Sequence, residues 1–299
     1  MLVAIPLLAL IGVGAFVGYS YWEYRTFWGD PNVPPSDVTS LGAVETKTFY
    51  SEALGQTMEY NIYLPPGYDD LRQRFTTYPV VYLLHGRPGA DNDWVSKGGA
   101  AEAMDTLLAE GQVQPMIIVM PQGSGSRFAY ATGYIDGPQG DWGTYISRDL
   151  VNEIDSNYRT VRSARGRAIA GLSEGGYGAM NLGLRNPSEF GVIGSFSGYF
   201  NIDQYDMPRI YGRDQSLAEA NSPMAYLPQL EGELPAIYFY VGGGDEKFLE
   251  ENQEFADELE TRGASYDFEI YKGAHSWDLW RGHLPNFLAY AAAHLKGGD

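Results

Sequence analysis

One serine in this sequence lies in surroundings that favour nucleophilic chemistry. Gly171-Leu172-Ser173-Glu174-Gly175 is the only G-x-S-x-G in the chain, and it connects a strand-like run at 167–170 to a helical stretch at 175–185. Glycines at these positions permit a sharp turn that exposes the serine hydroxyl, and the start of the helix offers unpaired N–H groups to a developing oxyanion. The sequence therefore predicts Ser173 as a nucleophile. The alternative is a tight turn whose serine caps the helix.

A serine nucleophile needs a general base, which is most often histidine. Of the four histidines, His275 follows the last strand-like run and comes after Ser173, which is the chain order typical of α/β-hydrolases. His283 and His294 lie in the last helical stretch, where surface or packing roles are expected. His85 ends an apolar run and is expected to shape a turn. We predict His275 as the base, the alternative being a structural histidine hydrogen-bonded in a loop.

The base in turn needs a carboxylate that orients its ring and stabilises its charged form. Asp245 comes directly after the next-to-last strand-like run, and we predict it as this acid. Glu246 and Glu250 are alternatives, although both are expected on the following helix, where a carboxylate favours the helix dipole. Asp278 is only three residues from His275, which makes it a poor partner for the far side of the imidazole.

Two backbone N–H groups are needed to bind the oxyanion that forms during acyl transfer. One is expected from Glu174, the residue after the nucleophile, and the other from the loop that follows the third strand. In that loop, which spans 85–89, Arg87 is the best donor because Pro88 has no N–H. The Arg87 side chain has two open interpretations, a contact with an anionic substrate or a solvated surface position.

Short apolar runs alternate with helical stretches along most of the chain. This alternation is typical of a mostly parallel sheet with helices on both faces, so the sequence predicts an α/β fold. The expected strands are at 45–50, 58–64, 79–84, 116–120, 167–170, 192–196, 235–241 and 266–271, and the expected helices are at 99–110, 144–157, 175–185, 247–262 and 277–294.

Long insertions follow two of the expected strands, at 121–143 and 199–234. In a parallel sheet such segments lie over the carboxyl ends of the strands, where ligands bind. Trp142 in the first insertion and Ser197, at the end of another strand, are therefore candidate substrate contacts. Packing of the insertion onto the sheet is the alternative for Trp142.

The N-terminus differs from the rest of the chain in composition. Residues 1–22 contain no Asp, Glu, Lys, Arg or His and are long enough to cross a bilayer core. We predict a membrane anchor at 1–22, a linker at 23–42 and a catalytic domain at 43–299. A cleaved signal peptide and a buried helix are the alternatives for the first segment. Because few basic residues flank the apolar run, we expect the domain outside the cytoplasm, either anchored or secreted.

Composition excludes several classes of function. The chain has 299 residues, with 20 Lys+Arg and 38 Asp+Glu, so its formal net charge is −18. A binder of nucleic acid needs a basic face, so no nucleic-acid partner is predicted. The absence of Cys excludes disulfides, thiolate catalysis and Cys-ligated metals. No metal site or cofactor is predicted, and the sequence does not specify an oligomeric state.

Taken together, the motifs across about residues 43–295 resemble the esterase D group of the α/β-hydrolase superfamily. That group includes S-formylglutathione hydrolases, feruloyl and acetyl-xylan esterases, and mycobacterial mycolyltransferases. The matching segments are Tyr60-Asn61-Ile62-Tyr63-Leu64-Pro65-Pro66-Gly67-Tyr68, Tyr82-Leu83-Leu84-His85-Gly86, Arg167-Ala168-Ile169-Ala170-Gly171-Leu172-Ser173-Glu174-Gly175-Gly176-Tyr177-Gly178-Ala179, Gly243-Gly244-Asp245 and Gly273-Ala274-His275-Ser276-Trp277-Asp278-Leu279-Trp280.

The resemblance implies an α/β-hydrolase fold in which Ser173, Asp245 and His275 form a catalytic triad. It also implies that the backbone N–H groups of Arg87 and Glu174 form the oxyanion hole. In one respect the chain departs from the family pattern, because the residue after the nucleophile is often Met there and is Glu174 here. Its N–H still serves, but we expect an anionic side chain at this position to disfavour anionic acyl groups.

The sequence therefore predicts a serine carboxylic-ester hydrolase that works through an acyl-enzyme. Its substrate would be an ester of a small molecule, a glycan or a lipid. An acyltransferase that resolves the same acyl-enzyme with a sugar or lipid hydroxyl is an alternative, because the acceptor depends on pocket shape. A second alternative is a non-catalytic, membrane-tethered binding protein on a hydrolase scaffold. The complete set of serine, histidine and aspartate disfavours it.

Overall fold

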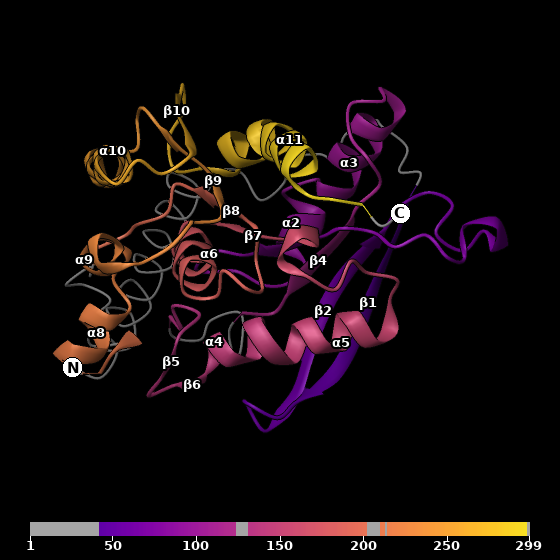
Figure 1. Ribbon diagram of the computed structural model, residues 1–299, viewed down its shortest axis with the longest axis horizontal. Helices are drawn as coiled ribbons and strands as arrows, with labels where there is room; N and C mark the ends of the chain where they lie inside the picture. Colours follow the sequence, from indigo (N-terminus) through magenta and orange to yellow (C-terminus); the bar gives the residue numbers. More distant parts are fainter. Residues whose placement is uncertain (1–41, 124–130, 202–209, 213, 298–299) are drawn as a thin grey trace, which may run out of the picture.

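The computed structural model of the protein describes residues 42–123, 131–201, 210–212 and 214–297. Figure 1 shows one central sheet between helices. The strands of this sheet are β1 (Ala43–Ser51), β2 (Gln56–Leu64), β3 (Val80–Leu84), β4 (Ile117–Pro121), β7 (Arg167–Leu172), β8 (Val192–Phe196), β9 (Ala236–Gly242) and β10 (Tyr266–Tyr271), and a separate two-stranded ribbon consists of β5 (Asp136–Gly137) and β6 (Gly140–Asp141).

The helices connect these strands. They are α2 (Asp93–Ser96), α3 (Ala100–Ala109), α4 (Trp142–Thr144), α5 (Val151–Asn157), α6 (Glu174–Arg185), α8 (Gln215–Ala220), α9 (Pro223–Tyr226), α10 (Glu246–Thr261) and α11 (Trp277–His294). A π-helical segment, Tyr145–Leu150, joins α4 to α5, and short 3-10 segments lie at Leu71–Gln73, Ala164–Gly166 and Leu227–Gln229.

The order of the strands creates a switch point near the middle of the sheet. The order is β1-β2-β4-β3-β7-β8-β9-β10. β1 and β2 pair antiparallel and β2 is antiparallel to β4, whereas all later neighbours are parallel. From β3 the chain crosses to β4 on one side and later returns to β7 on the other. Ligands of open α/β sheets bind at the carboxyl ends of the strands beside such a point.

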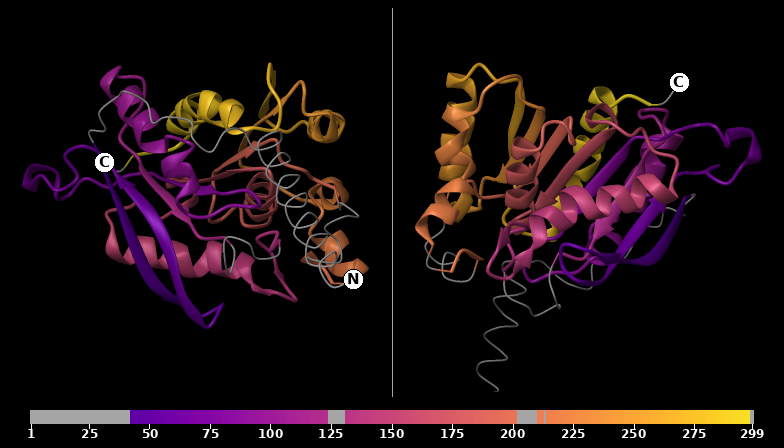
Figure 2. Two further views of the ribbon diagram at one scale, coloured as in Figure 1. Left: turned by 180° about the vertical axis from the view of Figure 1, so that it is seen from behind. Right: turned by 60° about the horizontal axis from the view of Figure 1, so that its bottom comes forward.

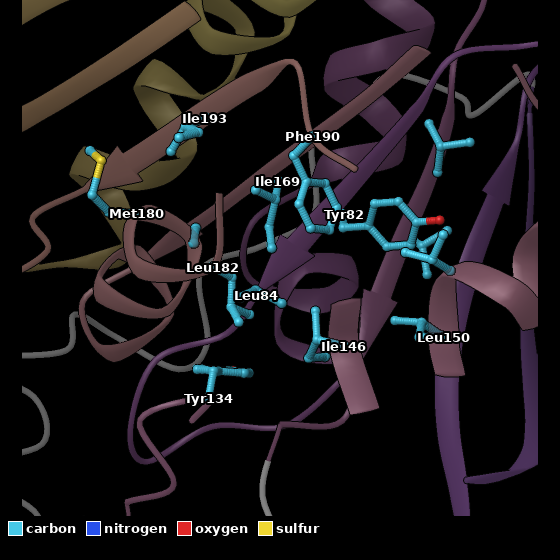
Figure 3. Packing of buried hydrophobic residues seen from close by; sticks show 14 of the residues in the cluster. Tyr82, Leu84, Tyr134, Ile146, Leu150, Ile169, Met180, Leu182, Phe190 and Ile193 are labelled. Atoms are coloured by element: carbon cyan, nitrogen blue, oxygen red, sulfur yellow. The ribbon is translucent and has the colours of Figure 1, made fainter. Parts of the chain in front are cut away.

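Two apolar cores, one on each face, hold the sheet. Along β3, Val80, Tyr82 and Leu84 pack into one core, while Val81 and Leu83 pack into the other. A strand buried on both faces reads as a continuous apolar run, which is why the sequence shows no alternation here. Side chains of α5, α6 and α10 complete the first core, part of which is drawn in Figure 3, and those of α3 and α11 complete the second. Figure 2 shows α5 and the pair α3 and α11 on opposite sides of the sheet.

The observed elements confirm the predicted α/β fold, with small differences at their ends. The strand before the nucleophile continues to Leu172 instead of ending at 170, and the next helix begins at Glu174. The insertion 199–234 contains α8 and α9, which the sequence analysis did not predict. The predicted apolar helix at 1–22 lies outside the described residues. Within the described ranges, no helix combines the length and the apolar character that a membrane crossing requires.

A glycine in α6 and one in α11 allow a test of how closely α6 packs on the sheet. A Cβ at Gly183 in α6 would lie 2.4 Å from Cγ1 of Ile193, whereas a Cβ at Gly282 in α11 would meet no atom within 4 Å. Both substitutions to alanine gain helix propensity, worth up to about 1 kcal/mol, but only the first overpacks the core, which costs about 1–3 kcal/mol.

We therefore expect Gly282→Ala to raise the free energy of unfolding and Gly183→Ala to lower it. Urea denaturation followed by circular dichroism measures both. Equal stabilisation by the two substitutions would contradict the close contact between α6 and β8.

Candidate active site

Ser173 is held in a strained turn between β7 and α6. Its backbone has φ 53° and ψ −118°, a region that residues other than glycine rarely adopt. The turn is fixed by its N–H, which donates to the carbonyl of Phe196 at 2.8 Å, and the residue is buried. Such strain persists only where the surroundings impose it, and here it presents the hydroxyl beyond the carboxyl end of β7.

The glycines around Ser173 let the backbone segments approach each other. A Cβ at Gly171 would lie 2.4 Å from the Gly175 carbonyl oxygen, and a Cβ at Gly175 would lie 2.5 Å from that of Leu84. Real Cβ atoms do not come this close, so any larger residue would push α6 away from the ends of β3 and β7. The G-x-S-x-G pattern is therefore a packing requirement as well as a turn signal.

A chain of hydrogen bonds connects Ser173 to two residues from loops at the same edge of the sheet. The Ser173 Oγ lies 3.0 Å from Nε2 of His275, and Nδ1 of His275 lies 2.6 Å from Oδ2 of Asp245. Because a carboxylate accepts, Nδ1 carries the proton and Nε2 is left to accept from the serine hydroxyl. All three residues are buried, so water competes little for these bonds. The arrangement lets the imidazole take a proton from the hydroxyl.

Aromatic side chains hold the imidazole of His275 in place. The ring of Phe248 lies 4.9 Å from it between centroids, and that of Trp280 packs edge-on at the same distance with an interplanar angle of 89°. These contacts restrict the ring to the plane that serves both of its hydrogen bonds.

The alternative acids and bases of the sequence analysis lie elsewhere. Glu246, Glu250 and Asp278 are exposed to solvent, whereas Asp245 is 5% exposed. His283 stacks on Tyr271 at 3.5 Å between ring centroids.

His85 and His294 also have structural partners. Nε2 of His85 accepts from the N–H of Gly123 at 2.8 Å and so joins the loops after β3 and β4, while Nδ1 of His294 lies 2.9 Å from the carbonyl of Tyr290 within α11. Of the four histidines, only His275 has a hydrogen bond to Ser173 among the described contacts.

Both predicted oxyanion residues border the serine. Glu174 is the first residue of α6, where N–H groups have no acceptor within the helix. Arg87 follows Gly86, at which a Cβ would lie 2.4 Å from Cδ1 of Leu172 and 3.3 Å from Cβ of Ser173. The loop after β3 therefore touches the nucleophile turn one residue before Arg87.

The anionic side chain of Glu174 was expected to disfavour anionic acyl groups, and this stays a prediction. In the structure, Oε1 accepts from the backbone N–H groups of Thr132 and Gly133, at 2.9 Å and 2.8 Å, and Oε2 lies 3.3 Å from Nε of Arg87. The carboxylate is thus engaged by protein groups. These contacts were not predictable from local sequence, because Thr132 is 42 residues away.

Tyr134, an aromatic residue of the insertion after β4, packs that insertion onto the body of the domain. Its hydroxyl donates to the carbonyl of His85 at 2.7 Å, which ties the insertion after β4 to the loop after β3. Burial raises the pKa of the Tyr134 phenol well above its usual range, so the hydroxyl keeps the proton that it donates.

The two candidate substrate contacts are both buried in packing environments. Trp142 is 4% exposed, packs edge-on against Tyr145 and donates its indole N–H to the carbonyl of Gln139. Ser197 is fully buried, and its Oγ lies 3.3 Å from the indole nitrogen of Trp280. These contacts of Trp142 agree with the alternative role given above, in which the insertion packs onto the sheet. Direct contact of either residue with a substrate stays a prediction.

Comparison with known proteins assigns the chain to a family. The family model described as "Putative esterase" matches residues 51–291. The chain belongs to this esterase family. An endo-1,4-beta-xylanase/feruloyl esterase of Xylanibacter ruminicola is 29% identical over 244 residues, which are 80% of this chain and 30% of that protein. The chain therefore spans about a third of the length of that relative.

Two further similarities extend the comparison. A diacylglycerol acyltransferase/mycolyltransferase of Mycobacterium avium is 27% identical over 268 residues, which cover 74% of this chain and 78% of that protein. A solved ferulic acid esterase is 28% identical with a TM-score of 0.76, covering 86% of this chain and 99% of that one. These similarities confirm the resemblance to feruloyl esterases and mycolyltransferases, and the fold that it implied.

The strain at Ser173 has a measurable consequence. Glycine adopts the Ser173 backbone angles without a steric cost, so we expect Ser173→Gly to be more stable than Ser173→Ala by about 1 kcal/mol, after the entropy cost of glycine is subtracted. Ser163 is the control, because its backbone is extended and exposed. There the order should reverse, with alanine more stable. Guanidinium denaturation measures the four variants, and the same order at both positions would rule out strain at Ser173.

Proposed function

We propose that this protein is a serine carboxylic-ester hydrolase in which Ser173, His275 and Asp245 act as a catalytic triad. The observation that carries the proposal is the hydrogen-bond chain from the Ser173 hydroxyl through His275 to Asp245, buried at the carboxyl ends of the parallel strands. Membership of the esterase family supports the same chemistry. The strained turn adds support, because a serine that only capped a helix would not need it.

In the proposed mechanism Ser173 Oγ attacks the ester carbonyl while Nε2 of His275 takes its proton. The tetrahedral intermediate collapses when His275 returns that proton to the leaving alcohol, which leaves an acyl group on Ser173. Water, activated by the same imidazole, then adds to the acyl-enzyme and releases the acid. Asp245 keeps the proton on Nδ1 of His275 and stabilises the imidazolium that forms. This chemistry requires no metal or organic cofactor.

The oxyanion is proposed to lie between the backbone N–H groups of Arg87 and Glu174. Their placement next to Ser173, one in the loop after β3 and one at the start of α6, supports this role. The amino end of α6 adds a partial positive charge, and the buried setting strengthens both effects relative to water.

The substrate is proposed to be an ester of a small molecule or a glycan. The Xylanibacter relative is named a xylanase and feruloyl esterase, and the solved neighbour is named a ferulic acid esterase. These names favour aromatic acyl groups as the first to test. A lipid ester is the further possibility raised by the mycolyltransferase relative.

Acyl transfer to a sugar or lipid hydroxyl is the second candidate function. The Mycobacterium relative, named an acyltransferase, favours it. Transfer and hydrolysis share every step up to the acyl-enzyme and differ only in the acceptor that resolves it. A non-catalytic tethered protein is not supported, because the three residues of the proposed triad are all present and joined.

A panel of chromogenic acyl esters, including a feruloyl ester, tests the proposed function. We expect Ser173→Ala to abolish turnover and labelling by a fluorophosphonate. Asp245→Asn should lower kcat by about 10³–10⁴-fold, because the amide favours the wrong tautomer of His275. Asp278→Asn and Ser96→Ala change exposed residues and should leave activity unchanged. Full turnover by Ser173→Ala would refute the proposal, and products formed with added alcohols would identify a transferase.

We also propose that residues 1–22 anchor the protein in a membrane, with the domain outside the cytoplasm. The described chain enters at β1, whose first residue pairs with Leu64 of β2. Because β2 is antiparallel to β4, this entry lies at the amino ends of the parallel strands. Ser173 follows the carboxyl end of β7, about 15–20 Å away along the strands. The first residues of β1 thus lie at the end of the parallel strands opposite to Ser173.

Deletion of residues 1–22 tests the anchor. We expect the full chain to sediment with membranes after a high-salt wash and the deletion variant to stay in solution, with equal kcat toward a soluble ester. Intact mass spectrometry of the full chain is the control for cleavage. If the mature protein lacks residues 1–22, the segment is a cleaved signal peptide. If the chain is intact but stays in the soluble fraction, both the anchor and the signal peptide are contradicted.

A further inference from the structure

The carboxylate of Glu174 lies between the two loops that border the nucleophile. The residue is 6% exposed. One carboxylate oxygen accepts from two successive backbone N–H groups, of Thr132 and Gly133, and the other lies 3.3 Å from the guanidinium of Arg87. A buried carboxylate is costly unless such partners compensate its charge. These contacts therefore compensate the charge of the buried Glu174 carboxylate.

The segment that Glu174 holds is itself unusual. Gly133 and Tyr134 both have positive φ, 59° and 54°, so the backbone there is bent to turn two N–H groups toward one acceptor. Thr132 Oγ1 also donates to the carbonyl of Gly123 at 2.8 Å, and the Tyr134 hydroxyl donates to that of His85. The start of α6, the insertion after β4 and the loop after β3 are joined at this point.

We propose that the Glu174 side chain is a positioning group for the oxyanion hole. This inference rests on the proposed function. Glu174 and Arg87 are the two residues whose backbone N–H groups are proposed to bind the oxyanion, and the side chains of the same two residues form an ion pair. The pair fixes the distance between the loop after β3 and the start of α6. The hydrogen bonds that Glu174 accepts from the Thr132 and Gly133 N–H groups hold the insertion after β4 against that pair.

A group that fixes oxyanion donors acts on the transition state more than on the bound ester. Its loss should therefore lower kcat and kcat/KM together and leave KM nearly unchanged. A side chain that served only folding would lower the melting temperature and leave the kinetics of the folded fraction as they are. This contrast separates a positioning role from a structural one.

Two substitutions at position 174 compare a side chain that keeps a hydrogen-bond acceptor with one that has none. Glu174→Gln keeps an oxygen that can accept from Thr132 and Gly133, and should retain kcat within about threefold. Glu174→Met removes every polar contact and should lower kcat, and the rate of fluorophosphonate labelling, at least tenfold. Asp149→Ala is the matched control. Its carboxylate accepts from Ser51 Oγ and from the Ala53 N–H near the edge strand β1, so its loss should lower stability with kcat unchanged.

The double variant tests whether Glu174 and Arg87 act as a unit. Arg87→Met alone should lower kcat by a smaller factor than Glu174→Met. The combination should be no more than about twofold slower than Glu174→Met, because both changes remove the same ion pair. If the double variant lost kcat by the product of the two single-variant factors, the claim that the pair positions the loops would be overturned. A kcat of Glu174→Gln as low as that of Glu174→Met would overturn it as well.

Hydrogen exchange provides a readout that does not depend on turnover. Peptides that contain Thr132 and Gly133 should exchange faster in Glu174→Met than in the wild type, and at the wild-type rate in Asp149→Ala. Unchanged exchange would overturn the inference whatever the activity. If Ser173→Ala abolishes turnover while Glu174→Met has wild-type kcat and labelling rate, the inference fails and the proposed function stands. Wild-type turnover in Ser173→Ala would instead refute the proposed function.

Discussion

The site depends on one constraint, the forced backbone angle at Ser173. A residue with φ 53° between a strand and a helix is kept there only because β3, β7 and α6 meet at distances that exclude a Cβ. The same contacts bring the start of α6 and the loop after β3 together next to the serine. Strain at one residue and close packing of its neighbours are therefore two aspects of a single arrangement, and each would relax without the other.

The histidine and the aspartate reach the serine because the last two strands are parallel and end together. Gly242, at the end of β9, pairs with Tyr271, at the end of β10. The following loops are then tied by a hydrogen bond from the Gly244 N–H to the Gly273 carbonyl at 2.8 Å, and a Cβ at Gly242 would lie 2.6 Å from that same oxygen. Glycines thus let the two loops touch, and Asp245 and His275 extend from them at hydrogen-bonding distance.

The sequence was sufficient for the eight strands of the central sheet and for the residues that this sheet brings together, but not for α8 and α9. Continuous apolar runs such as 79–84 indicated strands buried on both faces, and the order of Ser173, Asp245 and His275 indicated which loops would meet. Contacts between an insertion and a distant helix have no such periodic signal. The engagement of Glu174 by Thr132 and Gly133 depends on a local backbone bend and a long-range approach, neither of which residue types or spacing encode.

A carboxylate beside the proposed oxyanion hole presents an electrostatic conflict. Two negative charges a few ångströms apart in a buried site repel strongly, so an uncompensated Glu174 would oppose the charge that develops on the substrate. Here the guanidinium of Arg87 and two oriented amides meet the carboxylate first. Because these partners compensate the charge of the carboxylate, the start of α6 can still offer its partial positive charge to the proposed oxyanion. In our proposal the same pairing that compensates the charge also fixes the loops, so tolerance of the acidic residue and positioning of the site would have a common origin.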